Sequence, residues 1–135
     1  MTGRWVVLDT DVVSRYRAGR LPLGYARLVA ANDVSITFIT AGELWKGALT
    51  ARWGDARRGG LNLWLDEATT ISAGWAVARN WGAIATRAQL RGRSRPLHDT
   101  WIAACCIQRG LPLLTLNRRD FVDFAEHDGL VLLSG

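Results

Sequence analysis

Short apolar runs alternate along this chain with longer segments in which apolar residues recur every three or four positions. Trp5–Leu8 is a run of the first kind, and Leu23–Ala31 is a segment of the second. The short runs predict buried strands, whereas the longer period predicts amphipathic helices. Because this alternation is repeated along the whole chain, it indicates an α/β protein with a central parallel sheet flanked by helices on both faces.

The pattern predicts about five strands, separated by helices. The expected strands are Trp5–Leu8, Val34–Ile39, Thr69–Ser72, Leu113–Leu116 and Leu130–Leu133. The expected helices are Asp11–Arg17, Leu23–Ala31, Ala41–Trp53, Leu61–Glu67, Ala73–Arg91, Asp99–Arg109 and Arg119–Phe124. Thr40 is expected to cap the third helix and Gly110 to end the sixth. No repeat or linker divides the chain, so we expect a single domain over residues 1–135.

Acidic residues stand where these elements meet. Asp9 follows the first strand, Glu43 lies just after the second, and Asp99 opens the sixth helix. Asn117 and Asp120 follow the fourth strand. Ligands of parallel sheets gather at the carboxyl ends of the strands, so these side chains are expected to converge. Clustered carboxylates repel one another, and a hard cation such as Mg²⁺ or Mn²⁺ neutralises them.

Each acid also has a purely structural interpretation. Asp9 and Asp99 suit helix caps or first-turn positions, and Glu43 complements a helix dipole. For Asp120, the sequence leaves the choice between ligand and cap open. The two histidines, His98 and His127, do not have the spacing of a zinc site.

The charge of the chain suits a nucleic-acid partner. The net charge is +5, and Lys46 is the only lysine, so arginine supplies almost all of the positive charge. Arginine binds phosphate through paired hydrogen bonds and stacks on bases. A GC-rich genome produces the same bias, and composition does not separate the two explanations.

Two groups of arginines are candidates for contact with RNA. Arg87, Arg91, Arg93 and Arg95 lie at the end of the long helix, just before Asp99. Arg118 and Arg119 lie between Asn117 and Asp120. Both groups suit a phosphate-binding rim. The alternative for the first group is a solvated helix end, and for the second it is a pair of charges that balance the acids.

Membrane and disulfide chemistry are not expected. The apolar run Val6–Leu8 is interrupted by Asp9 and Asp11, and no run approaches bilayer length. Cys105 and Cys106 are adjacent and are expected to be buried free thiols in a reducing cytoplasm.

Four segments together resemble the motifs of PIN-domain proteins. They are Val7–Val12, Ile39–Leu44, His98–Ala104 and Leu114–Phe121, and they occur in the family's order along the whole chain. Their spacing looks most like that of the VapC-type ribonuclease toxins of toxin–antitoxin pairs. The resemblance implies a Mg²⁺-dependent endoribonuclease, a homodimer and a cognate VapB-like antitoxin that blocks the site.

Carried over by motif, the resemblance assigns Asp9, Glu43 and Asp99 to the metal site. Two residues are candidates for the fourth position of the site. They are Asn117, which lacks the negative charge common in the family, and Asp120, three residues later. The resemblance places Thr10 and Thr40 as hydroxyls that orient a ligand or water, and Asp11 as a further ligand or cap. Trp45 and Trp53 are expected on one helix, on a face that suits either an antitoxin helix or the core.

The expected reaction is hydrolysis of RNA loops by a metal-activated water, which leaves a 5′-phosphate and a 3′-hydroxyl. Two alternatives remain open. One is a regulatory module that acts on DNA together with its antitoxin, and the other is a metal-dependent phosphatase or DNA nuclease.

Overall fold

A five-stranded parallel sheet lies at the centre of the protein, which the computed structural model describes from residue 4 to residue 135. The strands are β1 Trp5–Leu8, β2 Asp33–Thr37, β3 Thr70–Ile71, β4 Leu113–Leu114 and β5 Leu132–Leu133. Their order across the sheet is β3-β2-β1-β4-β5, and every neighbouring pair is parallel. The central position of β1 places Asp9 between the ends of two other strands.

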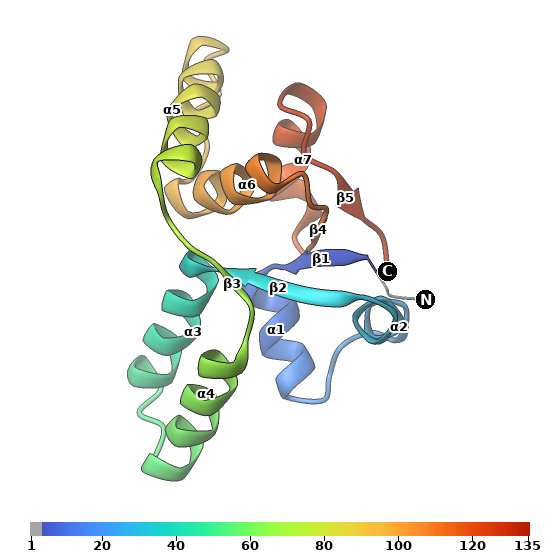
Figure 1. Cartoon of the computed structure of the whole chain (residues 1–135), viewed down its shortest axis with the longest axis vertical. Coiled ribbons are helices and arrows are strands. Elements are labelled where there is room, and N and C mark those ends of the chain that lie inside the picture. Colours follow the sequence, from blue (N-terminus) through green and yellow to red (C-terminus); the bar gives the residue numbers. More distant parts are fainter. Residues whose placement is uncertain (1–3) are drawn as a thin grey trace.

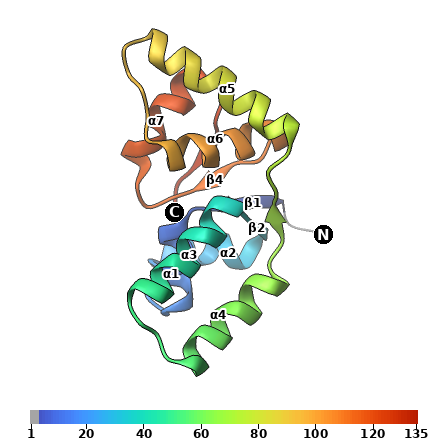
Figure 2. The same cartoon turned by 90° about the vertical axis from the view of Figure 1, so that its left-hand side faces the viewer.

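Helices cover both faces of the sheet. They are α1 Thr10–Arg17, α2 Leu23–Ala31, α3 Phe38–Thr50, α4 Asp55–Glu67, α5 Trp75–Leu90, α6 Leu97–Arg109 and α7 Arg118–His127. Figure 1 shows α5, α6 and α7 on one side of the sheet and α1 to α4 on the other. The same two layers are visible in the turned view of Figure 2. The predicted α/β class is therefore confirmed.

Alternation along the central strand produces the two cores. Val7 packs with α6 and α7 residues such as Ile102 and Phe121. Its neighbours Val6 and Leu8 point the other way, into the core under α1 and α2. Successive side chains of a strand point to opposite faces, so a strand that is buried on both sides reads as a continuous apolar run.

Several helix boundaries differ from the prediction, most clearly around α3. The helix begins at Phe38, and Thr37 rather than Thr40 is its cap, because the Thr40 N–H donates to the Thr37 hydroxyl at 3.2 Å. It ends at Thr50, and Arg52 then adopts a φ of 56°. Trp53 therefore lies beyond the helix, and its expected shared face with Trp45 is wrong.

Other differences are smaller. The helix α4 begins at Asp55 and includes the Gly59-Gly60 pair that was expected to precede it. The strand β4 pairs with its neighbours only at Leu113 and Leu114, so Thr115 lies just beyond the paired residues. Cys105 and Cys106 are buried free thiols as predicted, and burial raises the pKa of Cys105 to about 11. Within residues 4–135, no helix is long and apolar enough to cross a membrane.

The end of α6 gives a test of the backbone geometry. Gly110 ends this helix with a φ of 65°, and no atom lies within 4 Å of an added Cβ. The Gly110→Ala substitution should therefore lower the free energy of unfolding by about 1 kcal/mol through backbone strain alone. The matched variant Gly59→Ala, inside α4, should raise it by roughly 0.5–1 kcal/mol. Denaturant unfolding measures both, and equal effects of the two substitutions would contradict this interpretation.

Candidate active site

The predicted acidic residues lie near the carboxyl ends of β1, β2 and β4 and at the start of α6. Asp9 immediately follows β1 and is only 6% exposed. Glu43 lies in α3, which follows β2 directly. Asp120 lies in the first turn of α7, and Asp99 in the first turn of α6. The topology of the sheet thus brings the four predicted positions to one region.

Asp9 is held by hydrogen bonds on both of its carboxylate oxygens. Its Oδ1 accepts from the backbone N–H of Thr10 at 2.8 Å, which caps α1. Its Oδ2 accepts from the Thr115 hydroxyl at 2.7 Å. The same hydroxyl accepts from the backbone N–H of Asn117 at 3.0 Å, so the loop after β4 fixes the orientation of Asp9.

Glu43 is joined to both threonines that the sequence had singled out. The Thr10 hydroxyl donates to Glu43 Oε1 at 2.9 Å and lies 3.0 Å from the Thr40 hydroxyl. The other oxygen, Oε2, lies 3.5 Å from Nδ1 of His98. These contacts connect α1, α3 and the start of α6 around one carboxylate.

Burial and mutual repulsion perturb the two acids at the centre of this cluster. Burial raises the pKa of Asp9 to about 7, and the charges of Asp11 and Asp99 add to the effect, against the hydrogen bonds from Thr115 and Thr10. Burial likewise raises the pKa of Asp99 to about 6, with further contributions from the charges of Asp120 and Glu43. Strongly perturbed carboxylates that share one site are typical of functional centres.

Asp120 and Asn117, the two candidates for the fourth acidic position, differ in their surroundings. The charge of Asp120 acts directly on the pKa of Asp99. Asn117 is exposed, and its side chain makes no capping hydrogen bond to α7. The backbone N–H of Asn117 donates to the Thr115 hydroxyl, whereas Asp120 lies near enough to Asp99 for its charge to affect that carboxyl.

The donor set suits a hard divalent cation. Burial also raises the pKa of Asp11, and its Oδ2 is a buried oxygen without a hydrogen-bond partner. All the acids offer oxygen, which Mg²⁺ and Mn²⁺ prefer. Within the described part of the chain, no three acidic, histidine or cysteine side chains converge closely enough to hold an ion as they stand. Threonine hydroxyls instead donate hydrogen bonds to Asp9 and Glu43, and the ring of His98 lies beside Glu43.

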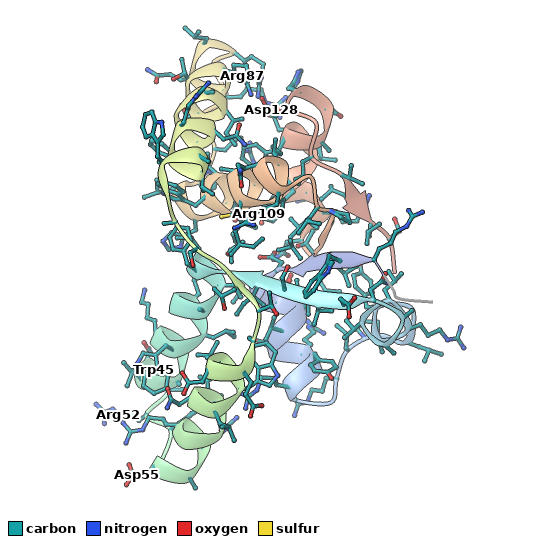
Figure 3. All side chains as sticks on the ribbon, viewed as in Figure 1. Trp45, Arg52, Asp55, Arg87, Arg109 and Asp128 are labelled. Atoms are coloured by element: carbon teal, nitrogen blue, oxygen red, sulfur yellow. The ribbon has the colours of Figure 1, made fainter. Side chains whose placement is uncertain are left out.

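The arginines are arranged differently from the predicted rim. Arg91 and Arg93 form ion pairs with Asp123 of α7, and Figure 3 shows Arg87 facing Asp128 between α5 and α7. Nη1 of Arg118 donates to the carbonyl of Leu133 in β5 at 2.7 Å.

The positions of two other arginines agree better with the expected contact with RNA. Arg95 lies near enough to Asp99 for its charge to oppose the rise in the pKa of that carboxyl. Arg119 is exposed, and no ion pair of its side chain occurs within residues 4–135. RNA contact by any of these arginines stays a prediction.

Sequence reasoning missed two residues of the site. Thr115 bonds Asp9, and its position immediately after an apolar strand, two residues before Asn117, was the available signal. His98 was not among the predicted site residues, yet it lies against Glu43 while its side chain remains 58% exposed. Its position next to Asp99 in the sequence was the signal.

This fold and this acidic cluster define a PIN domain. The PIN-domain profile matches residues 6–127, and the chain belongs to the PIN-domain family. Over 125 residues the chain is 30% identical to Ribonuclease VapC5 of Mycobacterium tuberculosis, covering 91% of this chain and 87% of that protein. The chain thus falls among the VapC-type members of the family, and the predicted resemblance is confirmed.

Solved structures agree with this placement. The crystal structure of VapBC-5 from Mycobacterium tuberculosis matches with a TM-score of 0.76 and 26% identity, over 97% of this chain and 98% of that one. VapBC-1 from nontypeable Haemophilus influenzae matches with a TM-score of 0.80 and 21% identity, over 96% and 97%. VapBC2 from Rickettsia felis, bound to a promoter DNA fragment, matches with a TM-score of 0.78 and 20% identity, over 96% and 97%.

The raised pKa values predict how the metal-free protein responds to pH. Because the pKa of Asp99 rises from 3.8 to about 6 on folding, protonation favours the folded state, and stability is lost as pH rises between these values. In EDTA at pH 7, Asp99→Asn should therefore be more stable than wild type by on the order of 1 kcal/mol. At pH 4 the difference should vanish. Thermal unfolding measures this, with the exposed Asp66→Asn as control; a variant less stable at pH 7 would contradict it.

Proposed function

We propose that this protein is a divalent-metal-dependent endoribonuclease toxin of a toxin–antitoxin system. The observation that carries the proposal is the cluster of mutually repelling carboxylates around the buried Asp9, in a chain similar to Ribonuclease VapC5. The expected substrate is an RNA loop, such as those of tRNA or ribosomal RNA, in the cytoplasm. Cleavage is expected to leave a 5′-phosphate and a 3′-hydroxyl.

Asp9, Asp99 and Asp120 are proposed to hold Mg²⁺ or Mn²⁺, together with Glu43. When bound, the ion neutralises the scissile phosphate and lowers the pKa of an attacking water. Thr115 holds Asp9 in orientation, and Thr10 does the same for Glu43. The unpartnered oxygen of Asp11 is available to orient a bound water.

Substrate contact is proposed for three basic groups beside these acids. Arg95 lies near Asp99, and Arg119 lies in the first turn of α7, directly before Asp120. His98 projects from the start of α6 and is half-exposed next to Glu43. Such basic groups attract the phosphates of RNA to the site, where the acids alone would repel them.

A groove that begins at the site supports an antitoxin as partner. It has a volume of about 450 Å³, runs between α1, α3 and α4, and is lined by Thr10 and Glu43 at the site and by Leu44, Trp53 and Leu61 along its length. We propose that a segment of a VapB-like antitoxin occupies this groove and so blocks access to Glu43. The related complex from Mycobacterium tuberculosis is described as a member of the VapBC toxin–antitoxin family. A homodimer stays a prediction.

One observation favours a second function. Several solved relatives are complexes with DNA, including the Rickettsia felis complex bound to a fragment of its own promoter. A role in a DNA-bound regulatory complex is therefore the alternative to nuclease activity. Metal-dependent cleavage of RNA by the isolated chain discriminates between them.

Asp9→Asn tests the nuclease directly. Wild type, purified free of any partner, should cleave total tRNA or ribosomal RNA into discrete fragments with Mg²⁺ or Mn²⁺ and not with EDTA. Asp9→Asn should lower the rate at least about a hundredfold, since metal stabilisation of a phosphoryl transition state amounts to several kcal/mol. Gel analysis with 5′-end chemistry measures both.

The control is Asp66→Asn, which removes an exposed carboxylate of α4 far along the chain from the site residues. It should cleave RNA like wild type. Cleavage that persists in EDTA and in Asp9→Asn would point to a contaminant or another mechanism. A folded wild type that binds Mn²⁺ without cleaving any RNA would favour the regulatory alternative.

Arg118 and Arg119 form a matched pair for testing RNA binding. Arg119→Gln should weaken binding of single-stranded RNA and reduce the slope of log affinity against log salt by about 0.7, the value for one lost phosphate contact. Arg118→Gln should mainly lower the melting temperature, because that side chain bonds the Leu133 carbonyl. RNA affinity measured over a series of salt concentrations tests this prediction. Identical slopes for both variants would contradict the proposed RNA contact of Arg119.

A further inference from the structure

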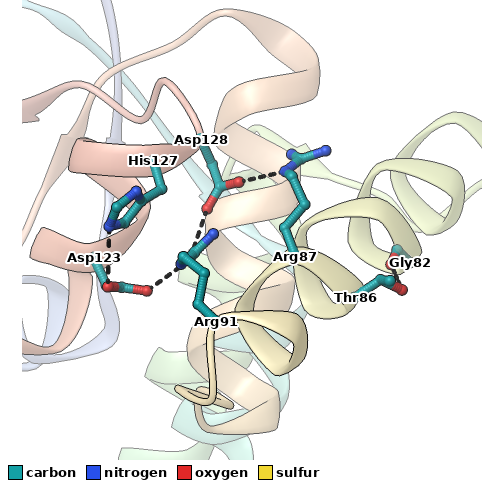
Figure 4. Close-up of polar contacts among 7 residues, drawn as sticks. All are labelled: Gly82, Thr86, Arg87, Arg91, Asp123, His127 and Asp128. Atoms are coloured by element: carbon teal, nitrogen blue, oxygen red, sulfur yellow. Dashed lines mark hydrogen bonds and ion pairs between the residues drawn. The ribbon is translucent and has the colours of Figure 1, made fainter.

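A buried cluster of opposite charges joins the end of α5 to α7 (Figure 4). Asp123 is only 2% exposed, and the side chain of Asp128 is completely buried. Nη2 of Arg91 lies 2.8 Å from Asp123 Oδ2 and 3.7 Å from Asp128 Oδ2. Nε of Arg87 lies 2.8 Å from Asp128 Oδ1. The end of α5 and α7, which are distant in sequence, are thus bridged by two guanidinium groups, and only that of Arg91 contacts both carboxylates.

Two further basic side chains lie near the other oxygen of Asp123. Its Oδ1 lies 3.7 Å from Nε of Arg93 and 3.8 Å from Nε2 of His127. The hydrogen bond from Arg91, with the charges of Arg91 and Arg93, lowers the pKa of Asp123 despite its burial. Asp123 is therefore a charged residue at the centre of the cluster.

The cluster lies between the two segments that present the acids of α6 and α7. Arg91 is the C-cap of α5, and only the residues up to Pro96 separate it from α6 and Asp99. Asp123 follows Asp120 by one turn of α7. The ion pair between Arg91 and Asp123 consequently ties the segment leading to Asp99 to the helix that bears Asp120.

This tie acts against a known repulsion. Asp99 and Asp120 lie in the first turns of α6 and α7, and bringing two like charges together costs free energy until a cation neutralises them. Phe121 and Phe124 pack α7 against the core, but apolar packing does not set the direction of a particular carboxylate. An ion pair with a fixed guanidinium geometry constrains that direction.

The cluster is poorly built for stability alone. Arg91 Nε and Asp123 Oδ1 are buried without hydrogen-bond partners, and so is Asp128 Oδ2. Buried ion pairs often stabilise a fold no more than apolar side chains of similar size would. These contacts are better suited to fixing the positions of neighbouring residues than to stabilising the fold.

We propose that Asp123 is a positioning residue of the active site. Through Arg91 it holds the starts of α6 and α7 at a fixed separation and so maintains the affinity of the Asp99–Asp120 pair for a divalent cation. The inference rests on the proposed function, because it requires these two carboxylates to bind the ion.

Direct titration with Mn²⁺ tests this without relying on activity. In isothermal titration calorimetry, Asp123→Asn should raise the Mn²⁺ dissociation constant about tenfold, an effect typical of residues that orient metal ligands. In RNA cleavage, the half-saturating Mg²⁺ concentration should rise by a similar factor, while kcat at saturating Mg²⁺ stays near that of wild type. Val29→Ala is the control, because it opens a void under α2, in the core on the other face of the sheet. It should lower the melting temperature and leave the metal affinity unchanged.

Arg91→Lys provides the second variant, because it keeps the positive charge while losing the planar guanidinium. It should raise the Mn²⁺ dissociation constant in the same direction, and it decides the question if Asp123→Asn does not fold. An unchanged dissociation constant, or an equal rise in Val29→Ala, would overturn the positioning role alone. A wild type that neither binds Mn²⁺ nor cleaves RNA would overturn the proposed function and, with it, this inference.

Discussion

Repulsion between buried carboxylates at the carboxyl end of β1 is the constraint on which the rest of this structure depends. Asp9 lies at the centre of the sheet, and its pKa is raised to about 7 by burial and by the charges of Asp11 and Asp99. A fold gains nothing in stability from such an arrangement in the absence of a cation. The sheet supplies both cores of the domain, whereas the placement of the carboxylates at its edge is explained by the chemistry proposed for the site.

The surroundings of the acids offset this repulsion in two ways. Hydroxyl groups bond the individual carboxylates, as Thr115 does for Asp9 and Thr10 does for Glu43. Ion pairs hold the backbone segments behind them, as Arg91 and Asp123 join α5 to α7. The first kind of contact orients an oxygen, and the second joins the end of α5 to the middle of α7. Together they allow a set of like charges to remain close in the folded chain.

The two layers of helices supply different parts of the site. The layer of α5, α6 and α7 supplies Asp99 and Asp120 and contains the ion pairs that place them. The layer of α1, α3 and α4 forms the groove that opens at Thr10 and Glu43. Because the acids stand at the boundary between the layers, a partner bound in the groove would be in direct contact with Glu43 without displacing the layer that positions Asp99.

The sequence by itself determined the class of fold, the strand β1 and the helix α2 to the residue, and the acids that follow the strands. These features depend on local periodicity and on the rule that parallel strands end at one edge, so they are readable along the chain. Only the tertiary structure decided that Thr37 caps α3, that Thr115 holds Asp9, and that Arg91 pairs with Asp123 rather than standing on an open rim. Apart from the local choice of Thr37, these contacts join residues tens of positions apart. Their energies depend on distances that no sequence pattern contains, because the packing of one helix against another sets them.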